Sequence, residues 1–185
     1  MSNYIARPLT DVPDYLVKTV VVPSGVTLYA GEVVTLGVLD TSISGNYTVF
    51  AATQMATAAL GSPIGIVING GFEKLPDGRR PAGQPDFTQY TFTAGDVVTV
   101  VELAVGMEFE ISNDSVNLNS LTPAAGQVLY PVNAAYTLTL DTAANGVPTG
   151  THSSLTVLGT KSFRLGGQFG AQFASTMVTI ANPKK

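Results

Sequence analysis

Glu108 and Glu110 are the two residues whose types and spacing come nearest to a catalytic arrangement in this sequence. If MEFEIS (107–112) is a strand, their carboxyl groups lie on one face, about 6–7 Å apart. Paired carboxylates at such separations hydrolyse glycosidic bonds. Catalytic carboxylates usually come from different strands, however, and alternating acidic residues are typical of the wet face of a single strand. We therefore predict a structural role for the pair and no enzymatic activity, and we keep a hydrolase as a third hypothesis.

His152 is the only histidine, and its neighbours Ser153 and Ser154 raise the question of a nucleophile with its base. A Ser-His-Asp triad needs a nucleophile, a base and an orienting carboxylate brought together. No G-x-S-x-G motif accompanies this histidine, and its surroundings have the composition of a loop. We expect a surface histidine.

The stretch SNDSVNLNS (112–120) is rich in the oxygen ligands that bind calcium. It contains one acidic residue, Asp114, where calcium loops usually carry several, and it lacks the EF-hand spacing. A turn capped by Asn and Asp side chains fits the stretch better. Because the chain has no cysteine, thiolate-bound zinc and iron–sulfur clusters are excluded. We predict no metal and no cofactor.

The charge of the chain limits its partners. The net charge is −4, and the only basic pairs are Arg79-Arg80 and Lys184-Lys185. Nucleic-acid binding needs clustered Lys and Arg to neutralise phosphates, so we predict no nucleic-acid partner. Charged residues make up only 12% of the chain, against about 25% in typical domains. Either uncharged polar residues keep the surface soluble, or a partner covers part of it, as in an oligomer or a lattice.

No stretch approaches the roughly 20 apolar residues of a membrane-spanning helix, and the start of the sequence has no signal-peptide core. We therefore expect a protein made in a cytoplasm, with no membrane partner.

The elements that would position these residues are short β-branched runs separated by turns rich in Gly and Pro. About a dozen such runs predict an all-β fold, a β-barrel or β-sandwich. In the run 107–112, alternation directs Met107, Phe109 and Ile111 to a core and the two glutamates and Ser112 to water. The run 96–104 is apolar on nearly every residue, which predicts burial on both faces or cover by a partner. Only residues 53–60 fit a helix, and a loop with one turn fits them as well.

A short motif recurs before three of these runs, as AGEVVTLG (30–37), AGDVVTVV (94–101) and AGQVLYPV (125–132). Glycine accepts a positive φ at no steric cost, so it suits a tight turn that leads into a strand. The unequal spacing of the copies excludes a solenoid. A phosphate-binding loop would need more glycines and would run into a helix. We predict a turn that recurs at the starts of strands.

Two segments stand apart from the strands. Residues 1–16 carry Pro8 and Pro13 and predict an extended N-terminal arm that is either disordered or laid along a neighbouring surface. Residues 17–185 would form a single β domain, from which residues 72–90, polar and rich in proline, project as a loop. An arm of this kind cannot bury its own apolar residues, so these are candidate contacts with a partner, as are the arginines of the loop. The candidates are Tyr4, Ile5, Leu9, Tyr15, Arg79 and Arg80.

The order VTLYAGEVVTLGVLD, GNYTVFAA, IGIVING, AGDVVTVVELAVGMEFEI and AGQVLYPV resembles small β-rich head decoration (cement) proteins of tailed bacteriophages. The resemblance covers roughly residues 20–140. It implies a protein on the capsid exterior that clamps neighbouring major capsid subunits, with an N-terminal arm that adds to the capsid surface. The insertion 72–90 and the runs at 154–181 depart from the family's pattern.

The sequence therefore leads to a structural virion protein, made in the host cytoplasm and placed on the capsid exterior. Its partner would be the phage major capsid protein, and it would form a homo-oligomer on the capsid lattice. The alternative is a receptor- or glycan-binding module of a head or tail fibre, with residues 72–90 as the recognition loop. The absence of tryptophan weakens the glycan-binding alternative, because sugar-binding sites usually stack rings on exposed aromatic side chains.

Overall fold

Short β-branched runs form strands throughout the part of the chain that a computed structural model describes. The described residues are 4–40, 49–54, 63–68, 91–140, 155–164 and 172–180, with the backbone alone at 161–164 and 172–180. They form twelve strands and two single-turn 3₁₀ helices, η1 (Asp14–Leu16) and η4 (Asn113–Ser115). The predicted all-β class is confirmed. Most of residues 53–60 lie outside the described residues.

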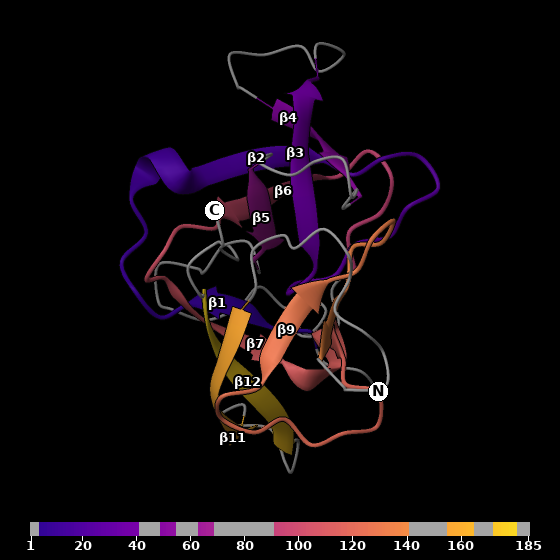
Figure 1. Ribbon diagram of the computed structural model, residues 1–185. Helices are drawn as coiled ribbons and strands as arrows, with labels where there is room; N and C mark the ends of the chain where they lie inside the picture. The colour runs from indigo at the N-terminus through magenta and orange to yellow at the C-terminus, as the bar shows by residue number, and fades with distance from the viewer. Residues whose placement is uncertain are drawn as a thin grey trace, which may run out of the picture.

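Five consecutive strands close into a barrel in the order β2-β4-β3-β5-β6 (Figure 1). β2 pairs in parallel with β4, and the other neighbours are antiparallel. The barrel closes because β2 also pairs with β6, with Val17 opposite Val101 and Val21 opposite Val97. The bounds are β2 (Val17–Val21), β3 (Val33–Leu39), β4 (Val49–Thr53), β5 (Ile64–Val67) and β6 (Val97–Glu102).

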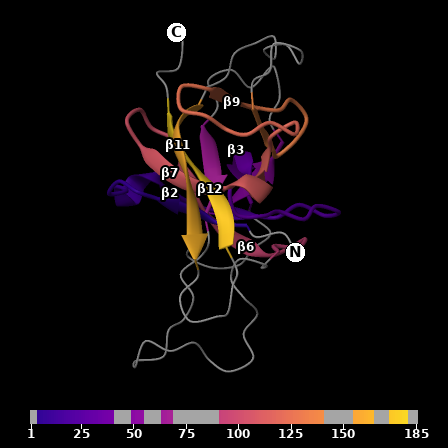
Figure 2. The ribbon, with the colours of Figure 1, turned by 90° about the horizontal axis from the view of Figure 1, so that it is seen from below.

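The remaining strands form a seven-stranded sheet in the order β1-β7-β12-β11-β9-β10-β8. Figure 2 shows its longest pair, β11 and β12, side by side in front of the barrel strand β3. The N-terminal strand β1 lies at one edge and pairs with β7 alone. The bounds are β1 (Ala6–Pro8), β7 (Glu108–Ser112), β8 (Val116–Asn117), β9 (Val128–Pro131), β10 (Leu138–Leu140), β11 (Leu155–Arg164) and β12 (Gln172–Ile180).

Two hydrophobic clusters hold these layers together, and the barrel strands contribute to both. One cluster fills the barrel and includes Val34, Val67 and Val100. The other joins the outside of the barrel to the sheet, because it contains the adjacent barrel residues together with the apolar face of β7 and the side chains of β9 to β11. The barrel residues of this second cluster are Val33, Ile66 and Val101. Successive strand residues point to opposite faces, so both faces of these strands are buried and their sequences read as continuous apolar runs.

The predicted burial of 96–104 on both faces is thereby confirmed for the centre of β6. Val100 lies inside the barrel, and Val101 packs in the cluster shared with the sheet. The cover comes from the same chain, so this run does not require a partner. Val97, at the start of the strand, is 52% exposed.

The recurring AG-x-V motif forms a turn before a strand in all three copies. Gly31, Gly95 and Gly126 have φ values of 94°, 87° and 87°. In each copy the residue after the glycine donates its N–H to the carbonyl oxygen three residues earlier, at 2.9–3.2 Å. Positive φ at the third position with this hydrogen bond is the pattern of a type II turn. The predicted turn is confirmed.

The second face of β7 corrects the sequence analysis. Phe109 and Ile111 are fully buried as expected, but Glu110 and Ser112 are only 1% exposed instead of facing water. A strand keeps a wet face only where nothing covers it. Here β1 pairs along the edge of β7, where Arg7 meets the Glu110 carboxylate and the Ile5 N–H meets Ser112 Oγ, so these polar side chains find partners in the protein instead of water.

Candidate functional site

The N-terminal segment contains several of the predicted contact residues and packs against β7. β1 runs antiparallel to β7, with Arg7 opposite Glu110. The Arg7 guanidinium donates to Glu110 Oε2, and both Nε and Nη2 lie 2.5 Å from that oxygen. Ile5 is only 6% exposed. The expectation that this segment cannot bury its own apolar residues is therefore wrong for Ile5, because the edge of β7 offers it both hydrogen bonds and cover.

A chain of buried hydroxyls ties this segment to the barrel. The N–H of Ile5 donates to Ser112 Oγ at 3.0 Å, and Ser112 Oγ lies 2.9 Å from Ser115 Oγ. Ser115 Oγ donates to the carbonyl oxygen of Ala30 at 2.6 Å. Because these groups are buried, each bond satisfies a polar atom that would otherwise be costly to bury. The two serines were assigned to a polar turn from the sequence, which contains no sign of partners so distant along the chain.

Tyr4 contacts the same region from outside. Its ring stacks on Tyr29, with ring centroids 4.2 Å apart and planes inclined by 28°. Tyr29 begins the first AG-x-V turn, which also receives the Ser115 bond at Ala30. The N-terminal segment thus meets the first turn twice, once through the tyrosine pair and once through the hydroxyl chain.

Glu32, in the first AG-x-V turn, has a carboxyl group with a strongly shifted pKa. Burial raises its pKa to about 7, against a smaller lowering by the hydrogen bond from the N–H of Tyr29 to its Oε2 at 2.9 Å. Burial, and after it the charge of Glu32, raises the pKa of Tyr136. The backbone of Tyr136 is close by, since its carbonyl oxygen accepts from Val33 N–H at 2.7 Å. A carboxyl with a pKa near neutrality can transfer protons.

The remaining candidates for chemistry are placed as follows. Glu110 is engaged by Arg7, so the pair Glu108 and Glu110 does not present two equivalent carboxylates to a cleft. Residues 113–115 form η4, and Asn117 Oδ1 accepts from the N–H of Asn119, as expected for an Asn-capped turn. Within the described residues, no three His, Cys, Asp or Glu side chains are grouped to hold a metal ion. Neither η1 nor η4 is long enough to cross a membrane.

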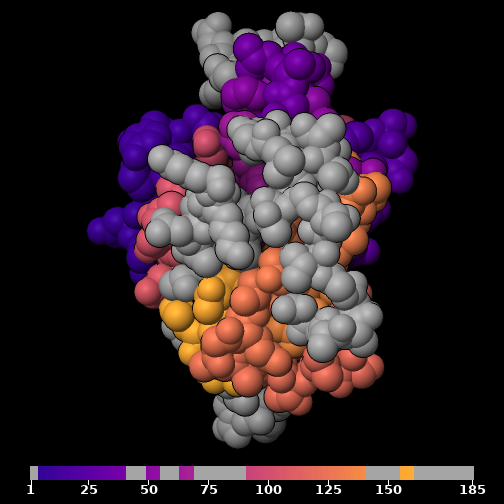
Figure 3. Space-filling view, viewed as in Figure 1, coloured from indigo at the N-terminus to yellow at the C-terminus, as the bar shows by residue number. Residues whose placement is uncertain are grey.

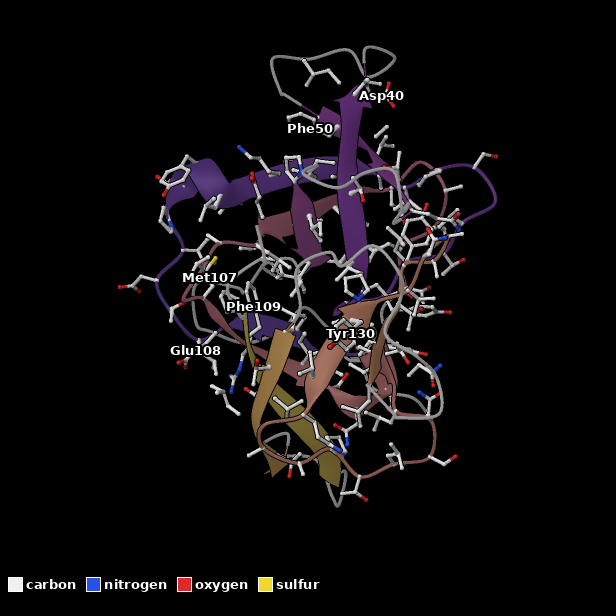
Figure 4. All side chains as sticks on the ribbon, viewed as in Figure 1. Asp40, Phe50, Met107, Glu108, Phe109 and Tyr130 are labelled. Carbon is white, nitrogen blue, oxygen red and sulfur yellow. The ribbon has the colours of Figure 1, made fainter. Side chains whose placement is uncertain are left out.

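The two connections between barrel and sheet run side by side. Residues 9–16 lead from β1 to β2, and residues 103–107 lead from β6 to β7. Both begin and end together because β1 pairs with β7 and β2 pairs with β6. Figure 3 shows the indigo N-terminal segment beside the pink segment that follows β6, at the left of the molecule. Met107 and Glu108 mark the end of the second connection in Figure 4.

Exposed apolar side chains occur on these two connections and at the first residue of β2. Leu9 and Tyr15, both predicted contact residues, are 38% and 71% exposed. Val17 and Val105 are 42% and 59% exposed. We call these four residues the junction patch. Leu16 and Met107, on the same connections, are buried in the shared cluster and anchor the patch to the body of the protein. The sequence predicted the first two residues through the arm but missed the two valines, which read as ordinary strand or turn residues.

The other predicted positions lie outside the described residues. Arg79, Arg80 and the whole segment 72–90 are among them, as is His152. Of the six candidate contact residues, the structure therefore places the four at the N-terminus, two in contact with the chain itself and two in the junction patch.

Comparisons with protein-family models, with curated proteins and with solved structures found no match. Arguments about function therefore start from the residues and geometry described above.

Proposed function

We propose that this chain is a structural virion protein that binds the exterior of an assembled phage capsid and stabilises contacts between major capsid subunits. It is made in the host cytoplasm, and several copies assemble on the lattice. The junction patch is the observation that carries the proposal. Its four apolar side chains are exposed, while Leu16 and Met107 beside them are buried in the core.

A patch of this kind suits a lattice more than a soluble ligand. Burying apolar surface gains about 25 cal/mol per Å², so one small patch binds weakly. Many copies on one shell act together, because each contact raises the effective concentration of the next. The low fraction of charged residues, 12%, agrees with a surface that partners cover in part. Because Leu16 and Met107 beside the patch are packed in the core, little of the adjoining chain needs to be ordered on binding.

In this proposal the N-terminal segment has a different role from the capsid-binding arm that the resemblance implied. The resemblance implied an arm that reaches the capsid, whereas residues 5–8 here pack on the edge of β7. Deleting residues 1–16 would remove Arg7 from the buried Glu110 and would unsettle the sheet. Surface substitutions in the junction patch therefore test capsid binding more cleanly than a deletion.

The test mixes purified protein with undecorated heads of a tailed phage that carries this gene, then measures co-sedimentation and the melting temperature of the heads. We expect the protein to co-sediment and to raise that temperature. A double variant, Tyr15→Ser with Val17→Thr, should reduce occupancy at least several-fold. Val38→Thr is the matched control, because Val38 is 80% exposed but lies at the far end of β3.

Absence of wild-type protein from the sedimented heads would overturn the proposed function. Binding by the double variant at wild-type occupancy would retain the function but reject the junction patch as its surface. The receptor- or glycan-binding alternative depends on residues 72–90, which lie outside the described residues. Retention of the protein on a glycan array, without head binding, would favour that alternative.

A further inference from the structure

Tyr4 and Tyr29 bring two phenol rings from distant parts of the chain into direct contact. Their ring centroids are 4.2 Å apart, and their planes are inclined by 28°. Both residues are partly exposed, so a small diffusing molecule can reach the rings. Stacked aromatic rings at this separation stabilise a fold, but two phenols in contact can also react with each other.

Backbone hydrogen bonds and packing hold both rings in place. Tyr29 opens the first AG-x-V turn, where its N–H donates to Glu32 Oε2 at 2.9 Å and its carbonyl oxygen accepts from Glu32 N–H at 3.2 Å. Tyr4 packs against the core cluster shared by barrel and sheet, and it precedes Ile5, whose N–H and carbonyl oxygen both bond to Ser112. Groups that a fold holds in contact react far faster than the same groups free in solution, so a reaction between these two rings is favoured over a reaction between two chains.

The composition of the chain directs one-electron oxidation to tyrosine. Tryptophan, cysteine and tyrosine are the side chains that give up a single electron most readily, and this chain has seven tyrosines but no tryptophan and no cysteine. Tyr15 is 71% exposed, but within the described residues its ring stacks on no second tyrosine. The rings of Tyr4 and Tyr29 are therefore the place in the described structure where a tyrosine radical meets a second phenol.

We propose that Tyr4 and Tyr29 are a site of oxidative cross-linking, which fixes the N-terminal segment to the barrel. A peroxide-driven one-electron oxidant, of the class of haem peroxidases, removes one electron and one phenolic proton from each ring. The two phenoxyl radicals couple through a carbon–carbon bond between ring positions ortho to the hydroxyl groups. The proton on each coupled carbon then moves through water to the phenolic oxygen and restores the aromatic ring. One molecule of hydrogen peroxide accepts the two electrons and two protons and becomes two molecules of water.

The cross-link strengthens the attachment of a short edge strand. β1 has three residues, lies at the edge of the sheet and pairs with β7 alone. Because Tyr4 stands directly before Ile5, a covalent bond from Tyr4 to Tyr29 keeps Ile5 beside Ser112. Cross-links such as disulfides stabilise a fold largely by restricting the unfolded chain, so we expect local opening of this segment to become rarer. Cross-linking does not depend on capsid binding.

The test treats dilute full-length protein with a haem peroxidase and hydrogen peroxide, measures dityrosine fluorescence in the monomer, and maps the links by fragmentation mass spectrometry. We expect a link between Tyr4 and Tyr29 within single chains, with the loss of two hydrogen atoms and a yield independent of protein concentration. Tyr4→Phe and Tyr29→Phe keep a ring to stack but lack the phenol, so each should lower the total intrachain yield several-fold. Tyr15→Phe is the matched control, because it removes a more exposed phenol and should leave that yield unchanged.

Absence of intrachain dityrosine in the wild type would overturn the proposal, as would an intrachain yield that Tyr4→Phe and Tyr29→Phe leave unchanged. A second measurement follows hydrogen exchange of the Ile5 amide before and after oxidation. Exchange should slow several-fold in the wild type and stay the same in Tyr4→Phe, whose methionines meet the same oxidant. An unchanged rate in cross-linked wild type would reject the fixing of the segment. Failure of head binding would leave all of these outcomes unaffected.

Discussion

The first and third copies of the AG-x-V turn are alike in their local structure. Gly31 and Gly126 have φ values of 94° and 87°. Both turns close with the same backbone bond, 3.2 Å long in each. In both, the side chain after the glycine accepts from the N–H three residues earlier, through Glu32 Oε2 at 2.9 Å and Gln127 Oε1 at 2.6 Å.

Their surroundings differ completely. A Cβ on Gly31 would lie 2.5 Å from Ser115 Cβ and 2.7 Å from Ile111 Cγ2, whereas a Cβ on Gly126 would meet nothing within 4 Å. Ala30 is 1% exposed and receives the buried Ser115 bond. Local sequence thus specifies the conformation of the turn, whereas contacts with distant parts of the chain determine how much the turn contributes to stability. The two copies share a conformation, but only the first is packed closely against the sheet.

The largest test of this contrast is Gly31→Ala against Gly126→Ala. Both variants must place a side chain at positive φ, which costs about 1–2 kcal/mol. Gly31→Ala adds a clash with residues of the sheet, and such overpacking costs about 1–3 kcal/mol more. Urea unfolding should therefore show a clearly greater loss of stability for Gly31→Ala. Equal losses in the two variants would show that the close contact of Gly31 with the sheet does not contribute to the difference in stability.

The first AG-x-V turn and its contacts show how much of the structure can be predicted from the sequence. The turn follows from Ala-Gly and a polar residue, and strand alternation correctly directs Phe109 and Ile111 inward, because both patterns are local. The contact between Gly31 and Ser115 joins residues far apart in the chain, and no period or composition encodes it. The same limit explains why Glu110 was expected to face water: its partner Arg7 lies 103 residues earlier in the chain.

The contact residues show a similar division. Tyr15 was predicted as an exposed contact residue from its place in a proline-rich segment, and it is exposed. Ile5 was grouped with it on the same reasoning, but the pairing of β1 with β7 buries it. Sequence can identify an extended segment, but not the edge against which it packs.

A smaller effect should follow from exchanging the capping residues, Glu32→Gln and Gln127→Glu. Burial raises the pKa of Glu32 to about 7 from 4.5, so the folded chain binds more protons than the unfolded chain between these values. Stability therefore falls as pH rises through this window. Glu32→Gln should remove that fall and make the variant more stable than wild type above pH 7. Because Gln127 shows that a glutamine caps this turn, the hydrogen bond should survive.

The reciprocal variant supplies the control. Gln127→Glu puts a carboxyl group into the copy whose glycine has open space around it, and it should add no comparable loss of stability between pH 5 and 8. The measurement is the free energy of unfolding in urea at both pH values. A wild-type pH slope in Glu32→Gln would show that the burial of this carboxyl does not govern the pH response of the fold.

The smallest effect is expected at the second copy, where the cap lies in an exposed turn. Asp96 Oδ2 accepts from Thr93 N–H at 2.6 Å and from Thr93 Oγ1 at 3.2 Å. Gly95, like Gly126, has nothing near its Cβ position. Asp96→Ala should cost about 0.5–1 kcal/mol, since water replaces a lost hydrogen bond in an exposed turn. Asp96→Asn keeps an acceptor and should cost less. An equal loss of stability in Asp96→Ala and Gly31→Ala would contradict this ranking. It would mean that the conformation of each turn determines its contribution to stability, and that the packing of the first copy against the sheet adds nothing.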